Sequence, residues 1–438
     1  MKVMKFGGTS VGNPQRIQHV AKLISGGDAK FVVLSAMSGT TNTLIEICDY
    51  LARDNRLGAG NIISRLEQTY NEHVSHLYSK AEYKAKAGQF ISETFNNLRK
   101  LSQMAYTISI RREIVSQGEI LSTHLMTYYL EECDESVCLL SALDFMKIGA
   151  DREPDELFIS EKLREILKAH AGYNIYITQG FICRNVDGET DNLQRGGSDY
   201  TASLIGAAIG AEEIQIWTDI DGMHNNDPRY VENTKPVKQL NFDEAAELAY
   251  FGAKILHPTC ILPAKFASIP VRLLNTLDPE AEGTIINNDM EQGKIKAIAA
   301  KDGITAIRIF SSRMLLASGF LSKVFDIFEH FKTSIDMITT SEVGVSMSID
   351  NPEHINEITH ELRKYGTVDI TNNMCIICAV GDLRWGNVGY ESLITDAMSE
   401  VPVRMISYGG SPHNISFLVK QEDKEKALKA LSKKLFDN

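Results

Sequence analysis

Two glycine-containing turns carry the residue types that bind phosphate. The sequence KFGGTS (Lys5–Ser10) follows the first apolar run, and its consecutive glycines would let backbone amides approach phosphate oxygens. The sequence GGSDYTASLIGAAIGA (residues 196–211) places two glycines and an acid before a helix of small residues, whose N-terminus favours anions. The first turn is neither a Walker A motif nor a dinucleotide fingerprint, so by itself it could also be only a tight turn.

Acidic and basic side chains also gather near two later apolar segments. The sequence IWTDIDGMHNNDPR (residues 216–229) leaves an apolar strand for a polar loop, and AAELAYFGAKILHP (residues 245–258) brings Lys254 to a turn that contains glycine. Ligands of open α/β sheets bind at the carboxyl ends of the strands. These segments therefore predict a binding site at that edge of a sheet.

The elements that would position these residues alternate between strands and helices over residues 1–295. The runs typical of strands are KVMKF, KFVVLSA, VCLLSA, NIYITQGF, IQIWTDI and PVRLLN. Their alternation with helical stretches predicts a mainly parallel α/β sheet covered by helices. Residues 43–127 contain no proline and have the apolar spacing of helices, so we expect a helical layer there.

The remainder of the chain contains an internal repeat of strand, helix, strand, strand and helix. The first copy starts at ITAIRIFSS and ends at HINEITHELRKYG, and the second runs from MCIICAVG to KEKALKALSKKLF. Two such units predict paired ferredoxin-like βαββαβ modules. We place the domain boundaries at 1–295, 301–371 and 372–438, and residues 296–300 could add a strand to the last module.

The composition excludes several classes of protein. A formal net charge of −12 argues against general nucleic-acid binding. No stretch approaches the ~20 apolar residues of a membrane span, and the N-terminus lacks an apolar signal segment, so we expect a cytoplasmic protein without membrane contact. Seven scattered cysteines favour reduced thiols over a disulfide framework.

Six motifs in a fixed order resemble those of one enzyme family. They are KFGGTS, SQGE, LQRGGSDYTA, WTDIDG, DPR and FGAKILHP. Together they resemble the aspartate kinase branch of the amino acid kinase family, and the repeat in the tail resembles its tandem ACT domains. The resemblance covers essentially the whole chain and implies an αβα sandwich. We expect a monofunctional enzyme, because the second repeat leaves no room for a homoserine dehydrogenase.

The resemblance implies that ATP, with Mg²⁺, phosphorylates the side-chain carboxylate of L-aspartate to 4-phospho-L-aspartate. This reaction is the first step towards lysine, methionine and threonine. It needs no general base, because a carboxyl with a pKa of ~3.9 is already ionised at neutral pH. The obstacle is the repulsion between an anionic nucleophile and a triphosphate, so catalysis requires positioning and well-placed cations.

The catalytic residues implied by the family pattern are Lys5, Asp199 and Lys254. The two lysines would contact phosphate groups, and Asp199 would orient the lysines or Mg²⁺. Without the family pattern, Lys5 could be a solvated lysine at a strand end, Lys254 could be a helix-terminal lysine, and Asp199 could simply cap the helix that follows it.

The family pattern also implies a substrate pocket. Arg195 would hold the α-carboxylate of aspartate through a bidentate pair, Glu119 would take the ammonium group, and Thr41 and Ser198 would complete the pocket. Glu119 and Arg195 could instead form a structural ion pair. Gln117 stands where the family commonly has a histidine, so the fine geometry there could differ.

The ATP-binding residues implied by the resemblance lie in four of the motifs, except His224, which lies between WTDIDG and DPR. They are Lys5, Gly7, Gly8, Thr218, Asp219, His224, Arg229 and Lys254. The sequence departs from the family pattern at two places: His224 stands where the family often has an aromatic residue, and NNDPR replaces the commoner TTDPR. The stacking of the adenine ring could therefore differ.

The tail resembles the effector site of lysine-inhibited aspartate kinases. The residues concerned are Met314, Ser318, Gly319, Phe320, Leu321, Asp336 and Thr340. Asp336 would hold the effector's ammonium group. The ACT pair could alternatively serve only for dimerisation, with Asp336 an exposed turn acid. We expect a homodimer or a dimer of dimers through these domains.

No metal site other than nucleotide-bound Mg²⁺ is predicted. Cys375 and Cys378 are three residues apart on a predicted strand and so point to opposite faces, and His73 and His76 have no further ligands nearby in the sequence. Two other functions stay open: a kinase of the same fold that acts on glutamate, acetylglutamate or a nucleotide, and a catalytically silent amino-acid sensor.

Overall fold

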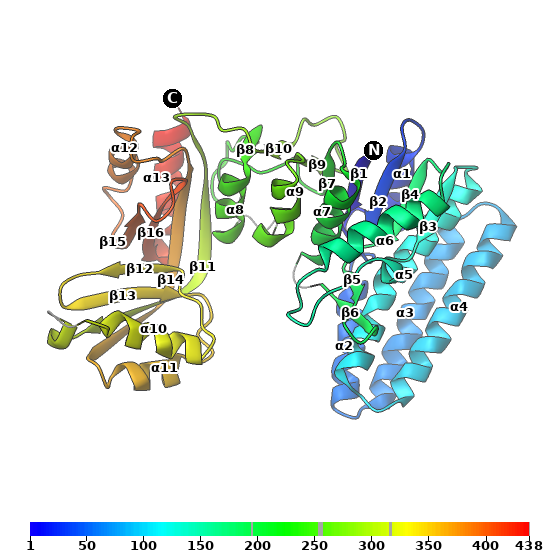
Figure 1. Ribbon diagram of the computed structural model, residues 1–438, viewed down its shortest axis with the longest axis horizontal. Helices are drawn as coiled ribbons and strands as arrows, with labels where there is room; N and C mark the ends of the chain where they lie inside the picture. Colours follow the sequence, from blue (N-terminus) through cyan, green and yellow to red (C-terminus); the bar gives the residue numbers. More distant parts are fainter. Residues whose placement is uncertain (194–195, 253–256, 315–317, 438) are drawn as a thin grey trace. The chain divides into compact units, whose positions relative to one another are not determined.

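The computed structural model describes residues 1–193, 196–252, 257–314 and 318–437, and the chain forms two compact units (Figure 1). The first unit comprises Met1–Met223 and Leu256–Asn288, and the second comprises His224–Ile255 and Asp289–Asn438. Two of the predicted site residues, Arg195 and Lys254, lie outside the described residues.

The first unit is built on a mainly parallel sheet. In spatial order its strands are β3 (Val137–Leu140), β4 (Ile175–Gln179), β2 (Lys30–Leu34), β1 (Lys2–Phe6), β7 (Ile214–Thr218), β9 (Val271–Asn275) and β10 (Thr284–Asn287). All of these neighbours pair in parallel except β10, which runs antiparallel to β9. The six strands predicted from the sequence are confirmed, whereas the short β10 was not predicted.

A helical layer covers one face of this sheet. Its members are α1 (Pro14–Ile24), α2 (Thr40–Ala52), α3 (Arg56–Leu77), α4 (Ala81–Gln103) and α5 (Ile108–Glu132), which share one hydrophobic core with β1 and β2. Figure 1 shows α3, α4 and α5 side by side. The predicted helical layer over residues 43–127 is therefore confirmed. The central helix α5 is buried on nearly every side from Ile114 to Leu130, so its polar residues must be satisfied by the protein or by a ligand.

The alternation of side chains along β1 separates the two faces of the sheet. Met4 and Phe6 point into the core shared with the helical layer. Lys5 lies between them and therefore points to the opposite face. That face is packed by α7 (Gly197–Ile209), which contacts β1, β2 and β7 and is flanked by α6 (Glu156–Ala169) and α9 (Leu262–Phe266). The unit is thus an αβα sandwich, as the sequence predicted.

Smaller elements complete the first unit. They are the hairpin of β5 (Ile182–Arg184) and β6 (Thr190–Asn192) and the 3₁₀ turns Ala142–Asp144 and Pro258–Ile261. The hairpin brings the chain back towards the start of α7, and Arg112 of α5 holds it through an ion pair of 2.9 Å with Asp191.

The second unit contains a six-stranded antiparallel sheet. In spatial order its strands are β12 (Met337–Thr340), β13 (Gly344–Ile349), β11 (Ile295–Phe310), β14 (Thr367–Gly381), β16 (Asn414–Lys420) and β15 (Val403–Tyr408). The helices of the unit are α8 (Phe242–Tyr250), α10 (Phe320–His330), α11 (Ile355–Leu362), α12 (Tyr390–Ala397) and α13 (Lys424–Phe436). The strand β8 (Gln239–Asn241) and the 3₁₀ turns Ser312–Met314 and Gln421–Asp423 complete the list.

Two long strands serve both ferredoxin-like modules. The first module uses the later part of β11 as its first strand and the start of β14 as its fourth. The second module reverses these roles, because residues 374–381 of β14 are its first strand and residues 295–301 of β11 pair with them as the fourth. Both strands change direction at this transition, where Gly303 and Asn373 adopt the left-handed conformation with φ of 76° and 57°.

Each module has its own hydrophobic core. Alternate residues of β11 and β13 pack with α10 and α11, and alternate residues of β14 and β16 pack with α12 and α13. Cys375 belongs to the second core and Cys378 does not, which confirms that they point to opposite faces of β14. Of the helices in the described ranges, none is long and apolar enough to cross a membrane.

Candidate active site

The glycine turn after β1 is held tightly against its neighbours. A Cβ atom at Gly8 would lie 2.8 Å from the carbonyl oxygen of Ala36, so only glycine fits there without displacement of the backbone. The amide of Gly7 donates a hydrogen bond of 3.2 Å to the carbonyl oxygen of Trp217. One of the two glycine amides is therefore used inside the protein, and the turn fixes the end of β1 to the end of β7.

Lys5 and Asp199 form an ion pair across the edge of the sheet. Lys5 Nζ lies 2.6 Å from Asp199 Oδ1, with side-chain exposures of 11% and 12%. Asp199 lies in the first turn of α7, where a carboxylate is favoured by the helix dipole. The interpretation of Lys5 as a solvated lysine is wrong, since its ammonium group lies at the wall of a cavity beside a carboxylate.

Glu119 on α5 is the second carboxylate of the site. The amide of Ala36 donates to its Oε1 at 3.2 Å, and its Oε2 has no hydrogen-bond partner among the described residues. Burial raises the pKa of the Glu119 carboxyl to about 7, against the opposing effect of the Ala36 amide. Gly118 permits this approach, because a Cβ atom there would lie 2.8 Å from Ala36 Cβ. The site thus holds a buried carboxylate oxygen that lacks a donor.

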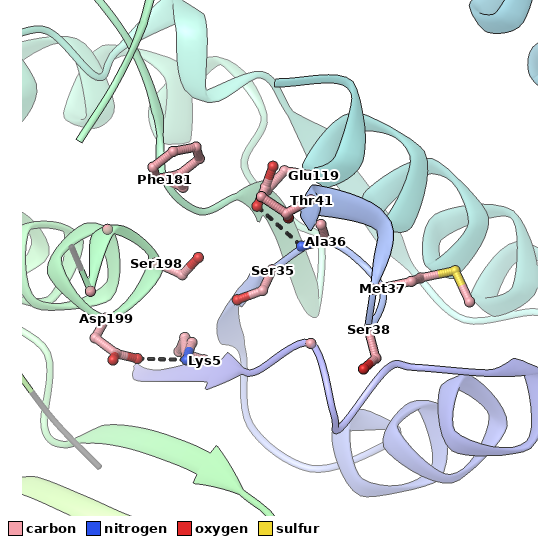
Figure 2. A pocket seen from close by; sticks show the side chains of 14 residues that line it. Lys5, Ser35, Ala36, Met37, Ser38, Thr41, Glu119, Phe181, Ser198 and Asp199 are labelled. Atoms are coloured by element: carbon pink, nitrogen blue, oxygen red, sulfur yellow. Dashed lines mark hydrogen bonds and ion pairs between the residues drawn. The ribbon is translucent and has the colours of Figure 1, made fainter. Parts of the chain in front are cut away.

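These groups line one cavity of about 330 Å³ in the first unit (Figure 2). Its walls come from the end of β1 and the turn after it, the loop from β2 to α2, helix α5, the residue before β5 and the start of α7. The lining residues are Lys5, Gly8, Ser35, Ala36, Met37, Ser38, Gly39, Thr41, Glu119, Phe181, Gly196, Gly197, Ser198 and Asp199. In Figure 2 the side chains of Thr41, Glu119 and Ser198 lie on the same side of the cavity as Phe181.

Two further close approaches shape this cavity. A Cβ atom at Gly180 would lie 2.5 Å from the side chain of Ser198. Only glycine at this position therefore leaves room for Ser198 and the start of α7 beside the cavity. Phe181 has a φ of 67°, an uncommon conformation for an aromatic residue, and its backbone is held by hydrogen bonds with Thr201 and Leu193. A residue keeps such a strained backbone only where the surrounding structure holds it, and such residues cluster at active sites.

Thr41 is positioned by the residue before it. Thr40 Oγ1 lies 2.8 Å from the hydroxyl of the fully buried Tyr70, which fixes the first turn of α2. Gln117 does not line the cavity; its amide donates to the carbonyl oxygen of Glu113 at 3.1 Å. Gln117, which stands where the family commonly has a histidine, is therefore not one of the residues that line the pocket.

The predicted nucleotide residues lie in both units. Thr218 ends β7 in the first unit, and its hydroxyl donates to Asp219 Oδ1 at 3.1 Å. In the second unit, His224 Nδ1 lies 2.8 Å from Thr234 Oγ1, and Arg229 forms an ion pair of 2.6 Å with Asp227. Arg229 is otherwise highly exposed, with 77% of its side chain accessible.

Sequence reasoning missed much of the loop from β2 to α2. Ser35, Ala36 and Ser38 line the cavity, and the rule that ligands bind at strand ends could have found them, because they follow the buried strand β2 directly. Phe181 had no comparable signal, since its left-handed conformation cannot be deduced from its residue type.

The predicted effector residues lie around the first ferredoxin-like module. Ser318 and Gly319 precede α10, with Gly319 at a φ of 81°, whereas Phe320 is buried and Thr340 is exposed. Met314 and Leu321 pack against the core of this module.

Asp336 occupies a buried ionic cluster in the second unit. Its Oδ1 accepts hydrogen bonds from Lys301 Nζ at 2.8 Å and from the hydroxyl of Tyr250 at 2.7 Å. Lys301 Nζ also lies 2.9 Å from Asp350 and 4.2 Å from the centroid of the Tyr250 ring. Burial raises the pKa of Asp336, although Lys301 opposes this shift. The interpretation of Asp336 as an exposed turn acid is wrong, because its side chain is 0% exposed.

The remaining histidines and cysteines form no metal site in the ranges that the structure covers. No cluster of three or more histidine, cysteine or acidic side chains suited to a metal ion occurs among the described residues. Mg²⁺ bound with a nucleotide would instead use oxygen ligands, and Asp199 and Asp219 supply carboxylates at the strand ends.

The fold and the cavity agree with a small-molecule kinase followed by an amino-acid-sensing module. Residues 1–275 match the amino acid kinase family, and residues 377–435 match the ACT domain. Lysine-sensitive aspartokinase 3 of Escherichia coli is 32% identical, with 99% of each chain covered. Chloroplastic aspartokinase 1 of Arabidopsis thaliana is 34% identical over 100% of this chain and 80% of its own.

A solved structure gives the same result. The crystal structure of E. coli aspartokinase III with aspartate and ADP is 32% identical, covers both chains completely and has a TM-score of 0.82. The chain belongs to the amino acid kinase family and, within it, to the aspartokinases. The resemblance stated from the six sequence motifs is thereby confirmed.

Proposed function

We propose that the protein is an aspartate kinase, which transfers the γ-phosphoryl group of ATP to the side-chain carboxylate of L-aspartate. The products are ADP and 4-phospho-L-aspartate, an acyl phosphate that opens the route to lysine, methionine and threonine. The observation that carries this proposal is the cavity in which the Lys5–Asp199 pair faces the unpartnered carboxylate oxygen of Glu119. The E. coli relative was crystallised with aspartate and ADP, which supports the same substrates here.

The buried carboxylate of Glu119 is suited to a substrate ammonium group. It is buried and accepts one hydrogen bond from the described residues, so an incoming cation would stabilise the negative charge that burial disfavours. Thr41 and Ser198 would add hydroxyl contacts from the same side of the cavity. Arg195 would bind the α-carboxylate, a role that rests on its position in the LQRGGSDYTA motif alone.

Lys5 supplies the cation that phosphoryl transfer requires. Its ammonium group is oriented by Asp199 at the wall of the cavity, and it would neutralise charge on the transferring group. Asp199 acts by holding Lys5, and it could also reach Mg²⁺. Lys254 would provide a second cation, again from its motif alone. The aspartate carboxylate needs no base, so the chain's own residues act by orientation and charge.

ATP would bind along the carboxyl ends of β1 and β7. Gly7 and Gly8 would let phosphates approach the backbone closely at the first turn, and Thr218 ends β7 beside that turn, with Asp219 directly after it. Mg²⁺ bound to ATP would neutralise phosphate charge, with Asp199 or Asp219 near it. The assignment of His224 and Arg229 to the adenosine and phosphate groups rests on their place in the sequence pattern alone.

We infer that lysine inhibits the enzyme through the ACT modules. The E. coli relative was also crystallised with lysine and aspartate, in a structure that is 33% identical to this chain with a TM-score of 0.83. An effector ammonium group at Asp336 would meet Lys301, which already binds that carboxylate. The second oxygen, Oδ2, has no hydrogen-bond partner among the described residues and is the acceptor that remains. Met314, Ser318, Gly319, Phe320, Leu321 and Thr340 would frame the effector.

We also propose the domain boundaries, the oligomeric state and the cellular location of the enzyme. The catalytic domain would span residues 1–295 and the two ACT domains residues 301–371 and 372–438, with β11 adding its first residues to the last one. Homodimers or dimers of dimers would form through the ACT domains, and the enzyme would act in the cytoplasm.

The direct test is the formation of acyl phosphate from MgATP and aspartate, trapped as the hydroxamate. Glutamate serves as the control substrate, because it differs by one methylene group, a difference of about 1–3 kcal/mol in a pocket of fixed size. We expect product with aspartate, little with glutamate, and less product when millimolar lysine is added.

Each other result overturns one part of the proposal. Product that lysine does not reduce would remove the regulatory part and leave the kinase. Equal product with glutamate would overturn the substrate assignment. No product with either amino acid would exclude the kinase activity and favour a silent sensor.

A further inference from the structure

Three segments of the first unit meet at Thr276, a buried residue directly after β9. Its amide donates a hydrogen bond of 2.8 Å to the carbonyl oxygen of Thr218. Its Oγ1 lies 2.7 Å from Ser10 Oγ, and its own carbonyl oxygen lies 2.7 Å from Nε2 of His19. Thr276 is 2% exposed, so all three polar groups of this residue are satisfied inside the protein.

The three partners belong to the elements that would hold the nucleotide. Thr218 ends β7 and precedes Asp219, Ser10 closes the KFGGTS turn after β1, and His19 lies on α1, the helix that follows this turn. The strands β1, β7 and β9 are neighbours in the sheet (Figure 1). Thr276, at the end of β9, therefore links the glycine turn after β1 to the end of β7.

The directions of these hydrogen bonds are constrained. Ser10 Oγ donates to the carbonyl oxygen of Trp217 at 3.4 Å, and a hydroxyl has only one proton to donate. Thr276 Oγ1 then donates to Ser10 Oγ. Since a carbonyl oxygen only accepts, His19 donates through Nε2 to Thr276. Each contact thus has one donor and one acceptor, which gives the cluster a single arrangement.

We propose that Thr276 is a positioning residue for the nucleotide. It holds the KFGGTS turn and the Thr218–Asp219 end of β7 in a fixed position relative to each other, and it touches neither substrate. The inference rests on the proposed function, because it assumes that ATP binds between these two segments. A merely structural Thr276 would affect the stability of the sheet without a preference for one substrate.

The experiment compares the binding of MgADP to wild-type protein and to the variants Thr276→Val and Thr276→Ser by titration calorimetry. Valine keeps the branched shape and both backbone hydrogen bonds but removes the donor to Ser10. We expect the Kd for MgADP to rise about five- to tenfold in Thr276→Val, in line with one lost hydrogen bond. Thr276→Ser retains the hydroxyl and should restore binding to within twofold of the wild type.

The matched control is Thr178→Val on β4, the same substitution at another fully buried threonine of this sheet. It should leave the Kd for MgADP unchanged. The KM for aspartate should change less than twofold in Thr276→Val, because Thr41, Glu119 and Ser198 are positioned by other contacts. Unchanged MgADP binding in Thr276→Val, or an equal loss for both substrates that serine does not restore, would overturn the inference.

The outcome also separates this inference from the proposed function. Wild-type protein that binds MgADP but forms no acyl phosphate would overturn the aspartate kinase assignment, and a selective Thr276→Val defect would still support the positioning role. An active enzyme whose Thr276→Val variant binds MgADP normally would overturn only the positioning role.

Discussion

Each of the two units contains a lysine–aspartate ion pair, and the two pairs have different surroundings. Lys5 Nζ lies 2.6 Å from Asp199 in the first unit, and Lys301 Nζ lies 2.8 Å from Asp336 in the second. The first pair lines a cavity and stands at the N-terminus of α7. In the second pair, Lys301 also contacts Asp350 and the ring of Tyr250, and the side chain of Asp336 is fully buried.

The difference determines what each pair can do. Asp199 has the dipole of α7 and the open cavity to stabilise its charge when Lys5 is absent. Asp336 has neither, and its side chain is completely buried. Removal of one partner from a buried pair leaves an uncompensated charge, which is the costly case. Without effector, the first pair should therefore matter mainly for activity and the second pair mainly for stability.

The largest expected effect is on turnover in Lys5→Met. Methionine keeps the apolar stem of the side chain and removes the charge that faces the cavity. We expect kcat to fall about 10³-fold, the scale of a lost electrostatic contact to the transition state. The KM values should change much less, and the free energy of unfolding should change by ~1 kcal/mol or less. The measurement combines steady-state kinetics with urea unfolding.

Lys301→Met provides the reverse case. We expect the free energy of unfolding of the second unit to fall by about 3 kcal/mol, because Asp336 and Asp350 lose their shared cation. Turnover without effector should stay within about threefold of the wild type. If Lys301→Met lost turnover and kept its stability, the contrast between the two pairs would be refuted.

Glu119→Gln tests the charge of the buried carboxylate. Glutamine can still accept the hydrogen bond from the Ala36 amide, but it cannot pair with an ammonium group as a charge. We expect the KM for aspartate to rise about 10- to 100-fold, as for a lost hydrogen bond between charged groups. The KM for ATP should be nearly unchanged. Equal effects on both substrates would contradict the role of Glu119 in aspartate binding.

The pH dependence of this site has a defined sign. The native Glu119 carboxyl has its pKa raised from 4.5 to about 7, so the folded protein holds a proton that the unfolded chain has released between these values. This group therefore lowers stability as pH rises from about 4.5 to 7, by ~3 kcal/mol in all. Aspartate binding requires the ionised form and should strengthen as pH rises through about 7. Both trends should be absent in Glu119→Gln.

Much of the fold follows from patterns that are local in the sequence. The apolar runs of β1, β2, β4, β7 and β9 and the proline-free helical layer were predicted, because burial on both faces leaves continuous apolar strands. The sharing of β11 and β14 between modules was not fully predicted. It depends on pairing between distant residues, from Phe310 with Thr367 to Ile295 with Gly381, which no local pattern encodes.

The candidate site could be predicted only in part for a similar reason. Lys5, Glu119, Ser198 and Asp199 were found through motifs, and the structure brings them to one cavity. The partner of Asp336 was not found. Lys301 and Tyr250 lie in other elements, and a sequence without covariation gives no sign that their side chains meet at this carboxylate.

The smallest expected effect concerns another buried polar atom without a partner among the described residues. Thr178 on β4 is 0% exposed, and its hydroxyl has no hydrogen-bond partner within the described part of the chain. Unlike Glu119 Oε2, it does not line the cavity, so no ligand is expected to satisfy it. Thr178→Val should therefore leave the kinetics unchanged and raise the free energy of unfolding by up to ~1 kcal/mol, because it removes an unsatisfied group. A loss of stability would indicate that the hydroxyl has a partner such as buried water. A change in aspartate KM would show that β4 itself contributes to the pocket.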